Sequence, residues 1–139
     1  MEIKEKVERI NTLISRESWL DMEIHGMNGG NLLIAGSVDF TYGHSLEIIF
    51  QDIFHMSVNS EWQVDTSKTV LYVVNNGEHV NINISYQIEQ GNTLFKIIAK
   101  DMKVPFYVSA KDIEFNTDKV LYYKKENLGE NERIASWVK

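Results

Sequence analysis

Residues 46–58 are the stretch around which we expect the rest of the chain to be organised, because seven of the thirteen are Leu, Ile, Phe or Val and none is Gly or Pro. β-Branched and aromatic side chains suit a pleated, half-buried surface, so this stretch predicts a long central strand or two strands in series. Ile48 and Phe50 point to one face of it. Ile53 reaches the same face only if the alternation slips by one residue, and Gln51–Asp52 is where we expect a bulge that provides this slip.

The N-terminal residues 2–14 carry the one strong helical pattern. Apolar side chains recur at intervals of four, three and four residues, and Leu13 widens the stripe. The members of this stripe are Ile3, Val7, Ile10 and Ile14. The pattern predicts a helix laid across one face of a sheet, and the alternative is a helix that meets a partner chain.

Shorter segments of alternating sequence predict further strands joined by tight turns. They are residues 19–24, 32–40, 69–74, 80–88, 93–100, 104–108, 113–115 and 119–123. Asn-Gly pairs at 28–29 and 76–77 favour hairpins, because both residue types tolerate the positive φ of a tight turn. Pro105 indicates an edge strand or the start of a strand.

The second of these strands places Val38 and Phe40 on the same face as Leu32, and residues 41–44 then form the turn into the long strand. The first three strands therefore predict an antiparallel meander. Residues 116–118 predict a last hairpin, and residues 124–139 are either a short helix or a docked strand.

The strictest alternation in the chain runs from residue 80 to residue 88. It predicts one buried and one solvated face, as in an antiparallel sheet with a solvent side. The side chains expected in the core are those of Ile82, Ile84 and Tyr86, and those expected outside are Asn81, Asn83 and Ser85.

Length and composition fit one domain that covers residues 1–139. The hydrophobic fraction of 43% is enough for a core, and neither a repeat nor a linker interrupts the chain. Strands without helices between them favour antiparallel pairing. The sequence therefore predicts an α+β fold, in which an N-terminal helix packs on a curved, mainly antiparallel sheet or partly closed barrel.

The same composition bounds location and chemistry. The chain has no cysteine, so it has neither a disulfide nor a thiolate nucleophile. Its longest uncharged run, residues 24–38, is too polar to span a bilayer, and its charged N-terminus has no apolar signal region. We expect a cytoplasmic protein that does not bind membranes.

The net charge of −6 is concentrated in one segment, residues 17–67, which contains eight acids and no Lys or Arg. Nucleic-acid binders gather basic residues, so this pattern argues against a nucleic-acid partner. A basic protein is the partner that such a segment would attract. The residues we assign to this partner-binding segment are Asp21, Glu23, Asp39, Glu47, Asp52, Glu61 and Asp65.

Two sets of side chains could carry chemistry. Asp21 and His25 are four residues apart and could form a general base or half a metal site. The second set contains two histidines and two carboxylates, which are the ligand types that zinc uses. It consists of His44, His55, Asp39 and Asp52. Neither set has the spacing of a known motif, so we assign no catalytic residue, no metal and no cofactor.

Residues 18–58 resemble a loose group of small bacterial proteins, some of which are grouped with immunity proteins of polymorphic toxin systems. Their pattern is Trp-His-Asp-Ala-x-Ile, a hairpin, and Leu-x-Ile-x-Phe-x-Asp-Val. This chain has Trp19-Leu20-Asp21-Met22-Glu23-Ile24 and then Leu46-Glu47-Ile48-Ile49-Phe50-Gln51-Asp52-Ile53, with Leu20 where the pattern has His. The resemblance implies a non-enzymatic β-rich domain that neutralises a partner protein.

Taken together, these observations favour a protein-binding module of immunity type that neutralises a basic, toxin-like partner. An acidic surface that only maintains solubility is the simplest alternative. A small-ligand pocket inside the curved sheet, lined by aromatic residues, is a second alternative. A hydrolase-type enzyme is the least favoured.

Overall fold

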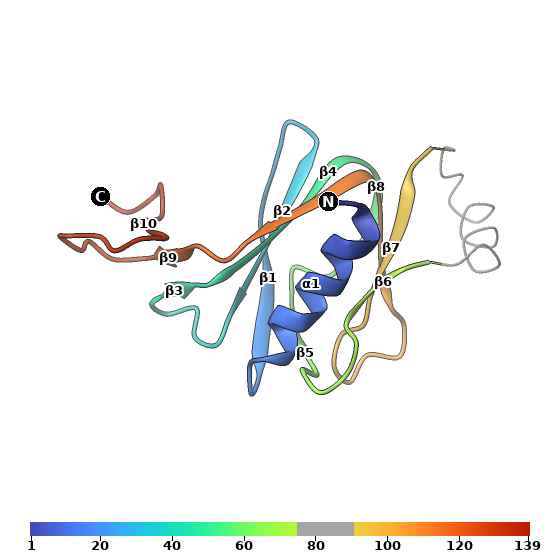
Figure 1. Ribbon diagram of the computed structural model, residues 1–139, viewed down its shortest axis with the longest axis horizontal. Coiled ribbons are helices and arrows are strands. Elements are labelled where there is room, and N and C mark those ends of the chain that lie inside the picture. Colours follow the sequence, from blue (N-terminus) through green and yellow to red (C-terminus); the bar gives the residue numbers. More distant parts are fainter. Residues whose placement is uncertain (75–90) are drawn as a thin grey trace.

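The computed structural model describes residues 1–74 and 91–139, and this part of the chain contains one helix and ten strands (Figure 1). The elements in chain order are α1 (Ile3–Ser15), β1 (Leu20–Asn28), β2 (Asn31–Ser37), β3 (Gly43–His44), β4 (Leu46–Ser57), β5 (Glu61–Val64), β6 (Leu71–Val73), β7 (Thr93–Ile97), β8 (Phe106–Asn116), β9 (Lys119–Leu121) and β10 (Glu132–Ile134). The strand predicted over residues 80–88, with its assignment of inward and outward side chains, lies outside the described residues.

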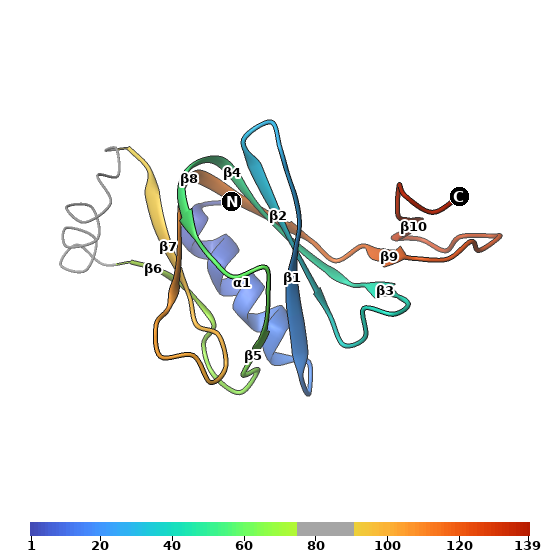
Figure 2. The same cartoon turned by 180° about the vertical axis from the view of Figure 1, so that it is seen from behind.

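Seven strands form one curled antiparallel sheet, with the order β5-β1-β2-β4-β8-β7-β6. The helix α1 lies across the concave side of this half-barrel, as Figures 1 and 2 show from opposite directions. The predicted α+β class and the β1-β2-β4 meander are confirmed. The long strand β4 lies at the centre of the sheet, with β2 on one side and β8 on the other.

The core lies between α1 and the concave face of the sheet. Val7, Ile10 and Ile14 on the helix are buried, as its apolar stripe predicts. They join a cluster in which the rings of Phe50 and Phe95 meet edge to face, with centroids 5.1 Å apart. Within the described ranges, packed side chains therefore fill the inside of the sheet.

The two edges of the half-barrel are covered in different ways. At the β5 edge, the backbone N–H of Lys100 donates to the carbonyl of Gln63. At the β6 edge, the amide of Asn11 takes the place of a neighbouring strand: it donates to the carbonyl of Leu71 at 2.8 Å and accepts from the N–H groups of Val70 and Leu71. An uncovered edge would leave such groups open to pairing with another chain.

The central strand β4 departs from simple alternation, as expected, although its register shift lies elsewhere. Asp52 has a positive φ of 53°, which marks a bend at the predicted place. The pairing of β4 with β8 nevertheless keeps its register from Gln51 to Ile53 and shifts only between Ile53 and His55. Ile53 still packs against the core, as predicted, whereas Phe54 is exposed.

A second, smaller sheet has the order β10-β9-β3 and lies at one end of the half-barrel (Figure 1). The backbones of β3 and β9 come so close that a Cβ atom on Gly43 would lie 2.1 Å from the carbonyl oxygen of Val120. The C-terminal residues 124–139, expected to be either a short helix or a docked strand, contain a docked strand, because β10 pairs with β9 in parallel.

Three predictions near this sheet are wrong. Residues 104–108 and 113–115 are not two strands, since β8 is continuous from Phe106, directly after Pro105. The hairpin across residues 116–118 does not form, because β9 pairs with β3 and β10 instead of β8. The second strand ends at Ser37, so Val38 is exposed rather than on its inner face. The hairpin error arose because β9 and β10 have only three residues each, too few to show an alternating pattern in the sequence.

Candidate functional site

The outer face of the sheet, opposite α1, carries a row of aligned residues that crosses five neighbouring strands, from the edge strand β5 to β8, and all of them except Ala35 are polar. Strand register aligns Glu23 with both Glu61 and Ala35, and it aligns Glu47 with both Ala35 and Asn116. Directly opposed residues have Cβ atoms about 4.5 to 5.5 Å apart. The row therefore brings together three glutamates that are far apart in the sequence.

Two histidines bind the two glutamates that lie on either side of Ala35 in this row. His25 Nε2 is 2.8 Å from Glu23 Oε1, and His44 Nε2 is 2.8 Å from Glu47 Oε2. The two imidazole rings contact each other edge to face, with centroids 4.9 Å apart. Both rings are largely buried, since the side chains are 10% and 2% exposed respectively.

Residues that follow β9 complete this polar cluster. The hydroxyl of Tyr122 is 2.6 Å from Nδ1 of His44 and 3.4 Å from Nε2 of His25. The ring of Trp137 covers both His25 and Tyr122, with centroids 5.8 Å and 5.1 Å away, while more than half of its own surface stays exposed. The C-terminal residues are thus held on the main sheet through the two histidines.

Glu47 is a buried carboxylate of the cluster that accepts hydrogen bonds from three side chains. Burial on its own raises the pKa of this carboxyl, but hydrogen bonds from His44, Asn116 and Arg133 outweigh burial and lower the pKa from 4.5 to about 2. Arg133 also donates to Asp118. Glu47 is therefore ionised at neutral pH and is buried among donors, although we had assigned it to the exposed partner-binding segment.

Tyr122 keeps its proton in this environment. Burial, followed by the negative charges of Glu23 and Glu47, raises the pKa of the phenol well above its ordinary value of 10.0. Its hydroxyl forms a hydrogen bond with Nδ1 of His44, and Nε2 of His44 donates to Glu47, because an ionised carboxylate can only accept. Tyr122, His44 and Glu47 are thus linked to one another by hydrogen bonds, so the cluster is better suited to holding the fold than to activating Tyr122 as a nucleophile.

Beside the cluster, the outer face opens into an acidic hollow of about 310 Å³. Its charged wall consists of Asp21, Glu23 and Glu61, which stand on the adjacent strands β1 and β5. Phe40, from the loop after β2, forms another wall and lies 5.8 Å from the ring of His25. Within residues 1–74 and 91–139, no lysine or arginine forms an ion pair with these three acids.

The remaining acids of the predicted segment lie apart from this hollow. Asp39 accepts the N–H of Thr41 in an exposed loop. Asp65 accepts hydrogen bonds from Ser67, which chiefly lower the pKa of its carboxyl, and has Lys68 at 3.9 Å. Asp52 is exposed at the bend of β4. Only three of the seven residues that we assigned from the sequence therefore gather at one place.

The two chemical sets proposed from the sequence do not form. His25 pairs with Glu23 rather than Asp21, because residues four apart on a strand are separated by roughly 13 Å. His44 has Glu47 and Tyr122 as its partners. Among the described residues, no group of three or more His, Cys, Asp or Glu side chains is arranged to hold a metal ion.

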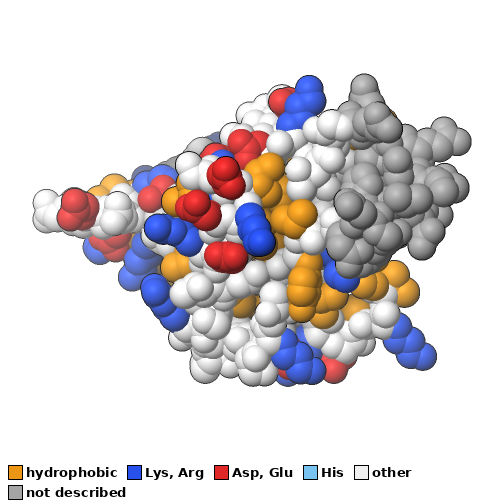
Figure 3. Space-filling model, turned by 45° about the vertical axis from the view of Figure 1, so that its right-hand side comes forward, with side chains coloured by type: hydrophobic (Ala, Val, Ile, Leu, Met, Phe, Trp, Pro, Cys, Tyr) orange, Lys and Arg blue, Asp and Glu red, His pale blue; other side chains and the backbone are white. Residues whose placement is uncertain are grey.

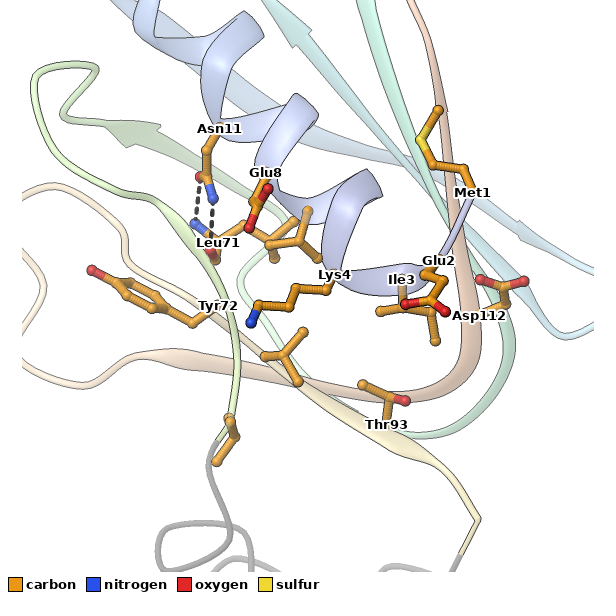
Figure 4. A pocket seen from close by; sticks show the side chains of 13 residues that line it. Met1, Glu2, Ile3, Lys4, Glu8, Asn11, Leu71, Tyr72, Thr93 and Asp112 are labelled. Carbon is orange, nitrogen blue, oxygen red and sulfur yellow. Dashed lines mark hydrogen bonds between the residues drawn. The ribbon is translucent and has the colours of Figure 1, made fainter.

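A hollow of about 810 Å³ lies between the start of α1 and the strand β6 (Figure 4). Its floor includes Ile3, Val7 and Leu71, and Lys4 and Glu8 extend over it from the helix. Figure 3 shows the neighbouring surface, where acidic and basic side chains are mixed around exposed hydrophobic ones. This hollow lies beside the core rather than inside the sheet, and it is not the aromatic-lined pocket that we considered from the sequence.

The sequence held signals for part of this site. Glu23 and His25 are two apart on a strand and so share a face, and Ala35 follows directly after a run of Leu and Ile. Nothing in the sequence indicated Tyr122, Arg133 or Trp137, because their positions depend on the short strands β9 and β10.

Comparison of the chain with protein-family models, with curated proteins and with solved structures found no match. Within the described residues, no helix combines the length and the apolar character needed to cross a membrane.

Proposed function

We propose that this protein is a non-enzymatic binding module of immunity type, and that it binds a basic partner protein over the acidic hollow on the outer face of its sheet. The observation that carries this proposal is the placement of Glu23 directly opposite Glu61, with Asp21 beside them on β1. Like charges that face one another across paired strands destabilise a sheet. Solubility alone does not require carboxylates to be placed opposite one another, so this arrangement favours a binding role.

A basic partner supplies what the hollow lacks. Arg or Lys side chains of the partner would neutralise the three carboxylates, and the ring of Phe40 offers a surface against which a guanidinium can stack. The negative field of these acids extends about 8 to 10 Å at physiological salt and raises the association rate more than the affinity. The resemblance of residues 18–58 to immunity proteins favours the same kind of partner.

The test begins with recovery of the partner by pull-down, followed by association rates at low and high salt. We expect the double reversal Asp21→Lys with Glu61→Lys to slow association and to flatten its salt dependence. Asp52→Lys is the control, because this acid is exposed like Glu61 but lies at the bend of β4, outside the hollow. If the double reversal and the control associate at the wild-type rate, the acidic hollow is not the binding surface and the proposal fails.

A further inference from the structure

The tip of the β1-β2 hairpin carries the pair Asn28-Gly29, and both residues are exposed. The strand ladder ends with Asn28 opposite Asn31, so the loop between them consists of Gly29 and Gly30. The φ angles of these two glycines are 61° and 81°, as a tight two-residue hairpin turn requires. Asn28 is therefore the last strand residue before a loop that has no side chains.

The side-chain amide of Asn28 is free to turn toward the main chain. Within residues 1–74 and 91–139, this amide forms no hydrogen bond with a side chain or with the backbone. The amides of Asn11, Asn31 and Asn116, by contrast, are each engaged in hydrogen bonds. Asn28 thus combines exposure, an unbonded amide and a glycine as the next residue.

The backbone nitrogen of Gly29 is the group that this amide can meet. It lies beyond the last rung of the ladder, so the ladder does not use its hydrogen. A Cβ atom on Gly29 would have no heavy atom beyond its chain neighbours within 4 Å, so the space around it is open. Glycine also lacks a side chain that would shield the nitrogen. Local opening of the terminal rung lets this nitrogen approach Cγ of Asn28.

We propose that Asn28 is a site of spontaneous deamidation, with water as the co-reactant. The nitrogen of Gly29 forms a bond to Cγ of Asn28 while the bond between Cγ and Nδ2 breaks, and Nδ2 leaves as ammonia with the proton from Gly29. The product is a cyclic succinimide. Water then opens this ring: cleavage of the bond from nitrogen to Cγ gives aspartate, and cleavage at the main-chain carbonyl gives isoaspartate. No group is oxidised or reduced in either step.

Isoaspartate has a structural consequence that aspartate lacks, because it inserts Cβ of residue 28 into the main chain beside a loop of fixed geometry. The hairpin tip also supports β4. The carbonyl of Gly30 accepts the N–H of Ile53 at 2.8 Å, and Oδ1 of Asn31 accepts the N–H of Asp52 at 3.1 Å. We therefore expect isoaspartate at position 28 to loosen the bend of β4. The inference does not depend on the partner proposed above.

Peptide mapping of the intact protein tests the site. The protein is aged in a mildly alkaline buffer, and mass spectrometry with fragmentation locates each asparagine that has become an acid and separates aspartate from isoaspartate. Asn28 should convert severalfold faster than Asn31, whose amide is engaged, and than Asn59, which is exposed but is followed by serine. The pair Asn76-Gly77 lies outside the described residues and is followed on a separate peptide.

Two variants separate the chemistry from the charge that it adds. Asn28→Gln keeps an exposed amide on a longer side chain, which closes a ring with the next nitrogen much more slowly, so position 28 should stay unconverted. Asn28→Asp carries the new charge on an ordinary main chain. Neither variant removes a contact of the fold, because the Asn28 side chain forms no hydrogen bond within the described ranges.

Hydrogen exchange at the amides of Asp52 and Ile53 reports on the bend of β4. Their protection should fall in the aged wild type in proportion to the isoaspartate fraction. It should stay at the level of the fresh wild type in aged Asn28→Gln and in fresh Asn28→Asp. The amide of Lys100, which donates to Gln63 at the β5 edge, is the internal control and should not change.

Three results would overturn the inference. The first is conversion of Asn28 that is no faster than that of Asn31 and Asn59. The second is an aged wild type in which isoaspartate does not form at position 28, or forms while Asp52 and Ile53 keep their protection. The third is an equal loss of protection in aged Asn28→Gln, which would assign the loosened bend to another change in the chain.

Discussion

Glu23 on β1 lies directly opposite Glu61 on β5, so that two carboxylates face one another across a pair of antiparallel strands. Within the described ranges, neither carboxylate has a lysine or arginine partner. Glu23 has a histidine partner on its own strand, His25. We expect Glu61→Gln to raise the free energy of unfolding by about 0.2 to 1 kcal/mol, because it removes a repulsion between opposed strands. Urea unfolding at neutral pH measures this change.

The control for this prediction is Glu130→Gln, which neutralises an exposed acid outside both sheets. Its effect should stay within about 0.5 kcal/mol, as is usual for surface substitutions. A loss of stability in Glu61→Gln would mean that Glu61 is paired favourably, and the like-charge explanation of the hollow would be abandoned.

Asn11 gives a second prediction, which concerns the edge of the half-barrel. Its amide makes three backbone hydrogen bonds, two to Leu71 at the start of β6 and one to the preceding Val70. Asn11→Ala should lower the free energy of unfolding by about 1 to 3 kcal/mol, because it leaves these partly buried backbone groups without partners. The loss should appear although alanine has the higher helix propensity. Denaturant unfolding provides the measurement.

Thr12→Ala is the neighbouring control on the same helix. Its hydroxyl bonds only the carbonyl of Glu8, within α1, and its side chain is exposed. The expected change is below about 0.5 kcal/mol. Equal losses in both variants would show that the helix, rather than its contact with β6, determines the effect.

Two phenylalanines on β4 test the bend in this strand. Phe50 is fully buried against Phe95, whereas Phe54, four residues further on, is 46% exposed. Phe50→Ala should destabilise the protein by roughly 3 to 5 kcal/mol, the usual cost of truncating a buried Phe. Phe54→Ala should cost much less. If thermal or urea unfolding shows that Phe54→Ala costs more stability than Phe50→Ala, the register described here for the central strand is wrong.

The parts of the fold that were predicted correctly are those in which a periodic pattern extends over several residues. The stripe on α1 and the alternation of Leu32 with Ile34 and of Ile48 with Phe50 each repeat the same choice of face. Repetition makes such a pattern readable, because one misplaced residue does not change the assignment.

The small sheet and the polar cluster could not be predicted in this way. The strand β3 has two residues and β9 has three, so neither shows an alternation. The cluster joins His25 to Tyr122, which are 97 residues apart. Their meeting depends on strand order and register, which a local pattern does not contain. The sequence likewise could not show which acids of the acidic segment are paired, because the base that binds Glu47 is Arg133, which lies far outside the segment.

Glu47 gives the last prediction, which concerns acid stability. The pKa of this carboxyl falls from 4.5 to about 2 in the folded protein. A folded pKa below the unfolded value stabilises the protein above the unfolded pKa, and the stabilisation is lost as the pH falls through the folded pKa. The loss expected between about pH 4.5 and pH 2 is on the order of 3 kcal/mol. Urea unfolding at closely spaced pH values measures it.

Glu47→Gln separates this carboxyl from the other acids of the chain. The variant should be less stable than the wild type at neutral pH, because Arg133 and His44 lose the charge that they bind. Its stability should also fall less steeply below about pH 4.5 than that of the wild type. Glu130→Gln should keep the wild-type slope, since this exposed acid has no such partners. If Glu47→Gln and the wild type lose stability in parallel in this range, Glu47 does not set the acid limit of the fold, and the buried cluster contributes less to stability than its contacts indicate.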